Sequence, residues 1–174
     1  RRVRLTCLAH GVVLSCGSLI TPTLIQKNRL VRSNPWIGSN LTIHPAAYVG
    51  AIFPGRMMKN HCSIPQGYMI NAFHDEGIMF EGATAPFMLL MALMPGLGRD
   101  YGAMVDSYHQ LGIFGFMIKD TGTGWVRPGV GQVPLVIYNL SRTDRRRLVR
   151  AMRILSEVFV AAGAQSLILP TLER

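Results

Sequence analysis

Few residues of this sequence are of types and spacings that could carry out chemistry. The densest titratable cluster is His74-Asp75-Glu76, which could act as an acid or base but is more typical of a turn before the apolar run at Ile78. The five histidines lie far apart and lack the i, i+4 spacing of a helical zinc pair, and the three cysteines match no metal-ligand spacing. Complete phosphate-binding loops and the G-x-S-x-G nucleophile elbow are absent. We therefore predict no metal site and find no catalytic motif.

One segment has the form of a ligand-binding turn. The apolar run Val12–Leu14 predicts a buried strand, small residues follow at positions 15–18, and Thr21-Pro22 predicts the start of a helix. Small side chains let the backbone approach a bound group, and a helix N-terminus suits a phosphate or the polar edge of a flavin. Taken alone, the pattern favours a plain strand-to-helix connection over a binding site.

Composition excludes several classes of protein. The chain has 174 residues, of which 49% are hydrophobic and 16% charged, which excludes a disordered chain and allows a sizeable core. The longest apolar stretch, Ala85–Leu97, contains two prolines and is too short to span a bilayer, so we expect no transmembrane segment. An odd number of cysteines favours free thiols in a cytoplasmic protein.

The net charge of +9 comes largely from arginines, many of them in one late segment. Leu148, Met152, Leu155 and Phe159 recur at helical spacing and predict a helix between the capping pair Ser141/Asp144 and Gly163. The opposite face carries Arg142, Arg146, Arg150, Arg153 and Glu157. Because stacking aromatics are absent from this face, we interpret it as a solvated surface and expect no nucleic-acid partner. A non-enzymatic basic module that binds nucleic acid or an anionic membrane surface is the alternative.

The remaining elements are short and separated by Gly and Pro, which indicates a mixed α/β protein. The predicted strands are Val3–Leu8, Leu41–Phe53, Gly67–Ala72, Ile78–Glu81, Gly112–Ile118, Leu135–Leu140 and Leu167–Leu169. We predict helices at Pro86–Met94 and Asp100–Gln110, and a turn or hairpin at Thr121–Gly131. Gly112–Ile118 is apolar throughout, as in a strand covered on both faces.

Two blocks of the sequence resemble the glucose–methanol–choline oxidoreductases, a family of flavoenzymes. VVLSCGSLITPTL (residues 12–24) resembles the family segment VV(L)AAG(A/S)LxTPxLL, and IGSNLTIHP (residues 37–45) resembles the following block, VGxNLxxHP. Residues 114–120, 126–129, 144–148 and 157–164 resemble the branch that contains long-chain fatty alcohol oxidases and choline dehydrogenase-like proteins.

This resemblance implies an internal fragment of an FAD-dependent enzyme that oxidises the CH–OH group of long-chain or otherwise hydrophobic alcohols. Residues 1–45 would end a Rossmann-like FAD-binding domain, and residues 46–174 would form part of a substrate domain with an antiparallel sheet and packed helices. The family's catalytic His and its partner would lie outside this chain, and peripheral association with a membrane stays open. The residues that match the flavin side are Ser15, Cys16, Gly17, Ser18, Thr21, Asn40 and His44.

Eight methionines fall in the part that matches the substrate domain. Their flexible thioethers suit an adaptable apolar channel, and they suit a methionine-rich core equally well. They are Met57, Met58, Met69, Met79, Met88, Met91, Met94 and Met117.

Expressed alone, residues 1–174 should oxidise no alcohol and hold no stoichiometric FAD, because both the phosphate loop and the catalytic base are missing. Visible absorbance of the purified chain and an alcohol oxidation assay test this. A yellow protein that turns over any alcohol would contradict it.

Overall fold

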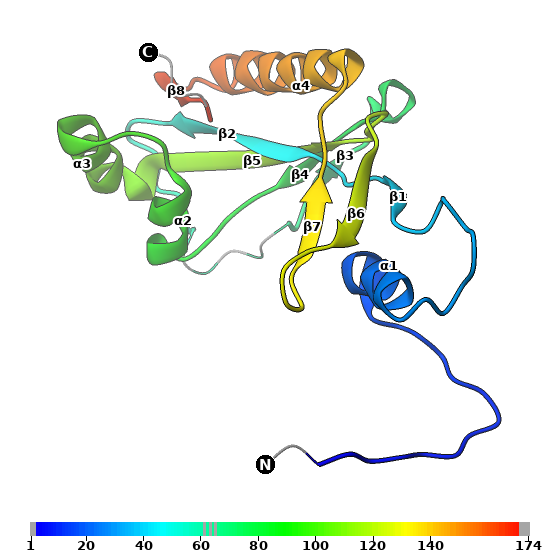
Figure 1. Cartoon of the computed structure of the whole chain (residues 1–174). Coiled ribbons are helices and arrows are strands. Elements are labelled where there is room, and N and C mark those ends of the chain that lie inside the picture. The colour runs from blue at the N-terminus through cyan, green and yellow to red at the C-terminus, as the bar shows by residue number, and fades with distance from the viewer. Residues whose placement is uncertain (1–2, 61, 63, 65, 171–174) are drawn as a thin grey trace. The chain divides into compact units, whose positions relative to one another are not determined.

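The computed structural model describes residues 3–60, 62, 64 and 66–170 (Figure 1). Within these residues, α-helices and antiparallel strands alternate, which confirms the predicted mixed α+β class. The elements are α1 (Gly17–Lys27), β1 (Ser39–Leu41), β2 (Ala46–Ile52), β3 (Met69–Ile70), η1 (His74–Glu76), β4 (Ile78–Gly82), α2 (Phe87–Leu93), α3 (Gly98–Asp106), η2 (Tyr108–Gln110), β5 (Leu111–Ile118), β6 (Gly124–Pro128), β7 (Pro134–Ile137), α4 (Arg142–Ala161) and β8 (Ser166–Ile168).

The chain divides into two compact units. The smaller unit contains residues 1–42 and 123–139, and the larger contains residues 43–122 and 140–174. The first crossing, between residues 42 and 43, lies close to the boundary that the sequence suggested, but residues 123–139 return to the N-terminal unit. Assignment of the two parts to flavin and substrate domains stays a prediction.

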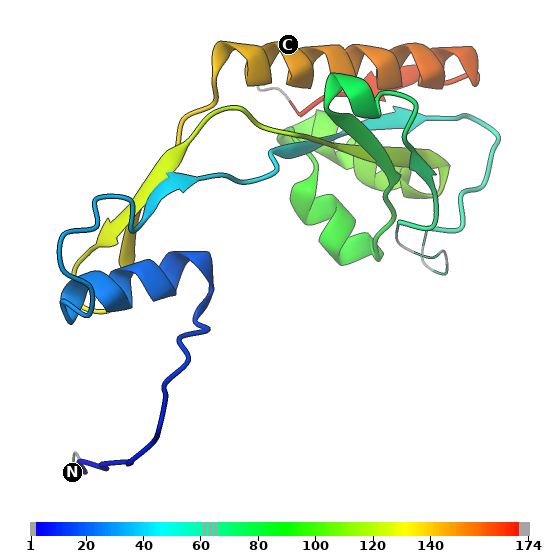
Figure 2. The same cartoon turned by 90° about the vertical axis from the view of Figure 1, so that its right-hand side faces the viewer.

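The larger unit is built on a five-stranded antiparallel sheet with the order β3-β4-β5-β2-β8. The central strand β5 pairs with β2 along its length and with β4 over five residues, and helix α4 lies across one face of the sheet (Figure 2). The strand predicted at Gly112–Ile118 is thus confirmed. The strand predicted at Leu41–Phe53 is wrong as one element, because β1 belongs to the smaller unit and β2 begins only after Pro45.

The core of the larger unit lies between α4 and the sheet. Alternate strand residues point toward the helix, and the predicted apolar face of α4 packs on them. The fully buried members of this cluster are Val49, Ile78, Phe80, Phe116, Ile118, Ala151 and Leu155. Each large side chain removed from water stabilises the fold by about 1.5–3 kcal/mol. This burial therefore determines which face of each strand points away from α4 and is available to pack against α2 and α3.

Helices α2 and α3 cover only one end of the opposite face. Leu90, Met91 and Met94 of the α2 region pack with Tyr108 and Leu111 in a second buried cluster. The predicted helices at Pro86–Met94 and Asp100–Gln110 are confirmed in position, the second ending in the short turn η2. Among the described residues, no helix covers the other end of this face, which contributes to the site described below.

The start of α4 is fixed by the buried carboxylate of Asp144. The predicted capping pair is confirmed, since Asp144 N–H donates to Ser141 Oγ (3.0 Å) and Ser141 N–H donates to Asp144 Oδ2 (3.1 Å). The same carboxylate accepts from Thr121 N–H and Gly122 N–H, both at 2.8 Å, and from the Thr121 hydroxyl at 2.9 Å. Burial alone would raise the pKa of Asp144, but these donors together hold it well below its usual range.

The predicted solvated face of α4 is confirmed, since its residues Arg142, Arg146, Arg150, Arg153 and Glu157 are all exposed. On this face Arg150 also forms an ion pair with Glu76 in η1, through two hydrogen bonds. The hydrogen bond from Arg150 holds the pKa of the Glu76 carboxyl below its usual range. Sequence reasoning missed this pair because its partners are 74 residues apart.

The smaller unit consists of α1 packed on the antiparallel sheet β1-β6-β7. Arg127 Nη1 and the Gln26 side-chain amide both donate to the Ile37 carbonyl oxygen, at 2.9 and 2.6 Å, and so join sheet, helix and loop. Strand β6 was not predicted as a strand of its own, because its Gly and Pro residues are typical of turns.

The N-terminal segment differs most from the sequence prediction. The strands expected at Val3–Leu8 and Val12–Leu14 are wrong, since residues 3–14 have no regular secondary structure and all of them except Leu14 are exposed. No strand among the described residues pairs with them, and an unpaired apolar strand has nothing to stabilise it.

No helix in the described ranges is long and apolar enough to cross a membrane.

Replacing Asp144 by Asn should lower the free energy of unfolding by about 2–3 kcal/mol, because the amide keeps one acceptor oxygen and turns a donor toward backbone N–H groups. Urea unfolding at neutral pH measures this. Because folding lowers the pKa of Asp144, its stabilisation is full above the ordinary carboxyl pKa of about 4 and is lost as the pH falls further. The two proteins should therefore converge in stability at acid pH.

Glu157→Gln is the matched control, since Glu157 is an exposed carboxylate on the same helix. It should change the free energy of unfolding by less than about 0.5 kcal/mol. Equal effects of the two substitutions, or no convergence at low pH, would contradict the role of Asp144.

Candidate functional site

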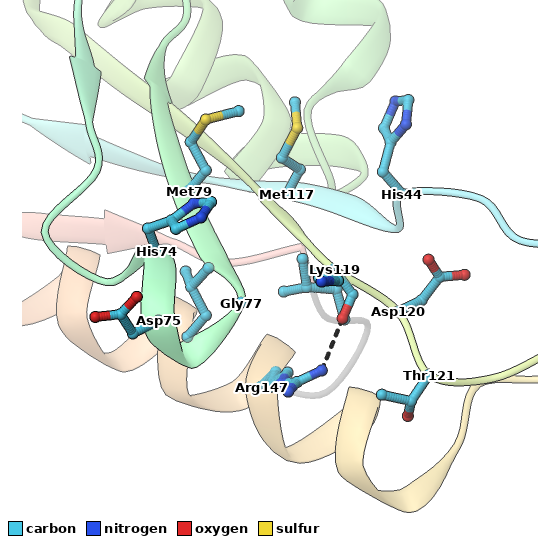
Figure 3. A pocket seen from close by; sticks show the side chains of 12 residues that line it. His44, His74, Asp75, Gly77, Met79, Met117, Lys119, Asp120, Thr121 and Arg147 are labelled. Carbon is cyan, nitrogen blue, oxygen red and sulfur yellow. Dashed lines mark hydrogen bonds between the residues drawn. The ribbon is translucent and has the colours of Figure 1, made fainter.

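A hollow of about 530 Å³ lies at the uncovered end of the larger sheet (Figure 3). Its lining comes from β4, β5, the turn η1, the loop after β5 and helix α4, all within the larger unit. The lining residues are His44, His74, Asp75, Gly77, Ile78, Met79, Met117, Ile118, Lys119, Asp120, Thr121 and Arg147.

Two methionines, together with Ile78 and Ile118, form the apolar part of this hollow. Met79 in β4 and Met117 in β5 are direct neighbours across the strands. Because successive side chains alternate between the faces of a sheet, both point away from α4, whereas Phe80 and Phe116 pack toward it. Figure 3 shows the two thioethers side by side, on the same side of the sheet as the imidazole of His44. Flexible thioethers can adapt to an apolar ligand of irregular shape.

The polar rim is held by contacts to the backbone. Arg147 Nη1 donates to the Lys119 carbonyl oxygen at 2.7 Å, and Asp120 Oδ2 accepts from Ile43 N–H at 3.0 Å, next to His44. Gly77 ends η1 with a left-handed φ of 72°, and a Cβ there would lie 3.3 Å from Arg147 Cζ. Glycine therefore lets the turn approach α4 closely.

The rim brings two imidazoles to the edge of the hollow. His44 precedes β2, and His74 lies in η1, where the structure confirms the predicted turn before Ile78. A neutral imidazole can both donate and accept a hydrogen bond. The arrangement can hold a hydroxyl or another small polar group above an apolar floor. Among the described residues, no group of three or more His, Cys, Asp or Glu side chains is placed to hold a metal ion.

A second hollow, of about 280 Å³, lies between α2 and the same face of the sheet. It is lined by Tyr48, Gln66, Ala83, Thr84, Ala85, Leu89, Leu90, Leu93, Met94 and Ile113. The Tyr48 hydroxyl donates to the Leu93 carbonyl oxygen, and burial raises the pKa of Tyr48. Sequence analysis missed this hollow, although the two-residue alternation of β5 places Ile113 on the face of Met117.

Six of the seven predicted flavin-side residues lie in the smaller unit. Ser15, Cys16, Gly17 and Ser18 form an exposed turn that leads into α1, which begins at Gly17 and not after Thr21. Thr21 does not cap a helix that follows it; its hydroxyl oxygen accepts from Cys16 N–H at 3.0 Å. Gly17 has a φ of +77° and no atom within 4 Å of its Cβ position, so the backbone conformation requires glycine there.

Asn40 and His44 lie in different units. Asn40 is an exposed residue of β1 with a left-handed φ of 58°, at the irregular step of its pairing with β6. Asn adopts this conformation more readily than other non-glycine residues. His44 belongs to the larger unit, where it lines the first hollow. A flavin contact for any of the seven stays a prediction.

The eight methionines fall into distinct groups. Met91 and Met94 are buried in the α2 cluster, which matches the core interpretation. Met79 and Met117 line the first hollow, which matches the channel interpretation. Met57, Met69 and Met88 are exposed on the surface, and Met58 is half-buried.

Comparison with curated proteins gives three matches that cover nearly all of this chain. Long-chain-alcohol oxidase FAO1 of Arabidopsis thaliana is 27% identical over 94% of the chain. FAO4B and FAO4A of the same plant are 29% and 23% identical over 90% and 89%. All three are named long-chain-alcohol oxidases. The chain spans only 21–22% of their length, and no family model matches it.

If Asn40 is needed only because it tolerates the left-handed backbone conformation, Asn40→Val should lower the free energy of unfolding by about 1–2 kcal/mol, whereas Asn40→Gly should change it little. Urea unfolding of both variants measures the difference. Thr42→Val, at a nearby position without a left-handed φ, is the control. Equal destabilisation by Gly and Val would show that the side chain, not the backbone conformation, matters at this position.

Proposed function

We propose that this chain is part of an FAD-dependent oxidoreductase of the glucose–methanol–choline type that acts on the CH–OH group of long-chain or otherwise hydrophobic alcohols. The observation that carries the proposal is the match of 89–94% of the chain to three long-chain-alcohol oxidases. The two hollows support it independently, because they combine an apolar lining with a polar rim. Residues 1–45 would contribute the end of the flavin domain and residues 46–174 part of the substrate domain.

The turn at residues 15–18 fits the edge of a flavin. Its side chains are small and exposed, no side chain caps the N-terminus of α1, and the first turn of the helix holds no acidic residue. Backbone N–H groups there can donate to an anionic or carbonyl oxygen. Exposed apolar side chains of Val12, Val13, Leu19 and Ile20 flank the turn and suit a flat aromatic ring system.

In such an enzyme, bound FAD would supply the acceptor for a hydride from the alcohol carbon. The residues of this chain would bind and orient the reactants. Backbone N–H groups of Gly17 and Ser18 would hold the flavin edge, because Cys16 N–H already donates to Thr21. The imidazoles of His44 and His74 would hydrogen-bond the hydroxyl of the alcohol. Met79 and Met117 would contact the first carbons of its chain and exclude water from them.

The alternative function, a basic module that binds a polyanion, rests on the exposed arginines of α4. Arg150 and Arg153 form ion pairs with Glu76 and Glu157, which reduces the free positive charge of this face. Arg145 Nη2 also donates to the Leu140 carbonyl oxygen at 3.3 Å. Salt-dependent binding to heparin or to anionic vesicles would favour this alternative, and peripheral attachment to a membrane would use the same surface.

The full-length protein should be yellow and should oxidise decanol in preference to glucose or choline. In that protein Ser18→Leu should lower the flavin-to-protein absorbance ratio at least twofold, because a large side chain would occupy the space of the flavin edge. Gly17 is less suitable for this test, since any side chain there strains the backbone whether or not a flavin is present.

Asn28→Leu, at the other end of α1, is the matched control and should leave the flavin content unchanged. A folded Ser18→Leu protein with its full flavin content would show that the turn is not a flavin contact. A colourless full-length protein without alcohol oxidation would overturn the proposed function itself.

A further inference from the structure

The two hollows are lined by the same face of the central strand. In β5 the side chains of Ile113 and Met117 point away from α4, and each lines one of the hollows. Gly115 lies between them on this face. Met117 lies four positions after Ile113 in the strand, a distance of roughly 13 Å at the usual rise per residue.

Gly115 places no side chain of its own between the hollows. The three atoms nearest to a Cβ at this position would be the carbonyl oxygens of Ala47 and Glu81, at 3.6 Å, and the Ala83 Cβ, at 4.0 Å. These are ordinary contact distances, and the φ of Gly115 is not left-handed. Neither packing nor backbone conformation therefore requires glycine here.

Other glycines of the sheet show what a packing requirement looks like. At Gly112, on the α4 side of β5, a Cβ would lie 3.0 Å from the ring of Phe53. At Gly50 in β2 it would lie 3.2 Å from the Ile168 Cβ. A strand glycine without such a neighbour weakens the strand and often marks a position where a ligand approaches the backbone closely.

The residues on either side of Gly115 are held by hydrogen bonds of their own. Tyr48, its neighbour in β2, donates its hydroxyl to the Leu93 carbonyl oxygen at the end of α2. Glu81, its neighbour in β4, accepts from the Gln66 side-chain amide at 2.8 Å. The side chains of Tyr48 and Glu81, which flank the glycine, are therefore both held by hydrogen bonds.

We propose that a single alkyl chain occupies both hollows and passes over Gly115, so that this glycine determines which chain lengths the site accepts. The lining fixes the direction of the ligand. His44, His74 and Lys119 lie at the first hollow and suit a hydroxyl group, whereas Leu89, Leu90 and Leu93 line the second and suit the end of an alkyl chain. The identity of the ligand as an alcohol rests on the proposed function, whereas the path of the ligand along β5 rests on the geometry of the two hollows.

Calorimetric titration of residues 1–174 with butanol, hexanol and decanol tests the path. Because each buried methylene adds up to about fourfold in affinity, decanol should bind at least tenfold more tightly than hexanol. In Gly115→Leu this difference should disappear, while butanol, which fits in the first hollow, binds as before. Gly115→Ala adds one methyl group at ordinary contact distance, should fold normally, and should give an intermediate value.

Gly102→Leu is the control, because Gly102 in α3 has nothing within 4 Å of its Cβ position and lies outside both hollows. It should keep the preference for decanol. Equal affinity of the unmodified chain for hexanol and decanol would overturn the path. A preference for decanol that survives both substitutions at Gly115 would overturn it as well.

The outcome separates this inference from the proposed function. If the chain binds decanol along the path but the full-length protein oxidises no alcohol, the path stands and the proposed function fails. If the full-length protein oxidises alcohols but its chain-length profile is the same with Gly115→Leu, the function stands and the path fails.

Discussion

The two-residue alternation of β5 is the constraint on which the larger unit depends. Phe116 and Ile118 are buried against α4, and their burial commits Met117 and Ile113 to the opposite face. A slip of one residue in the pairing with β2 or β4 would bring the methionines into the core and leave the aromatic residues in water. The same hydrophobic burial that holds the sheet to its helix therefore also determines what the uncovered face can bind.

Asp144 holds together the two chain segments that leave and re-enter the larger unit. The chain leaves the larger unit just after Gly122 and returns to it just before Ser141, and the carboxylate accepts hydrogen bonds from both segments. A buried carboxylate with several donors is more strongly held than a neutral cap, since hydrogen bonds to a charged group are stronger. One residue thus starts α4 and also closes the end of β5, next to Lys119 and Asp120 at the rim of the first hollow.

Sequence reasoning predicted the elements whose signals lie in consecutive residues. Helix α4 has its period, its Ser141–Asp144 cap and its closing Gly163 within one segment, so it could be predicted nearly to the residue. The break between β1 and β2 could not be predicted, because it arises from β1 joining the sheet of the smaller unit while β2 joins the sheet of the larger unit. The first hollow combines residues 44, 74, 75, 77–79, 117–121 and 147, which only the pairing of β2, β4 and β5 and the packing of α4 bring together. Among the predicted flavin-side residues, only His44 lies there, and its place follows from Pro45 and the start of β2.

The lining of the second hollow limits the chemistry of any occupant more strongly than its volume does. Its walls are mostly aliphatic, and the Tyr48 hydroxyl is already bonded to Leu93. A sugar or another polyol placed there would lose its hydrogen bonds to water and find few in return, at a cost of about 1–3 kcal/mol for each buried hydroxyl. A primary alcohol with a long alkyl chain avoids this cost, because its single hydroxyl can stay at the histidine rim while only methylene groups enter the hollow. If the proposed function holds, the site would discriminate between ligands by the position of their polar groups, and the protein could select for chain length.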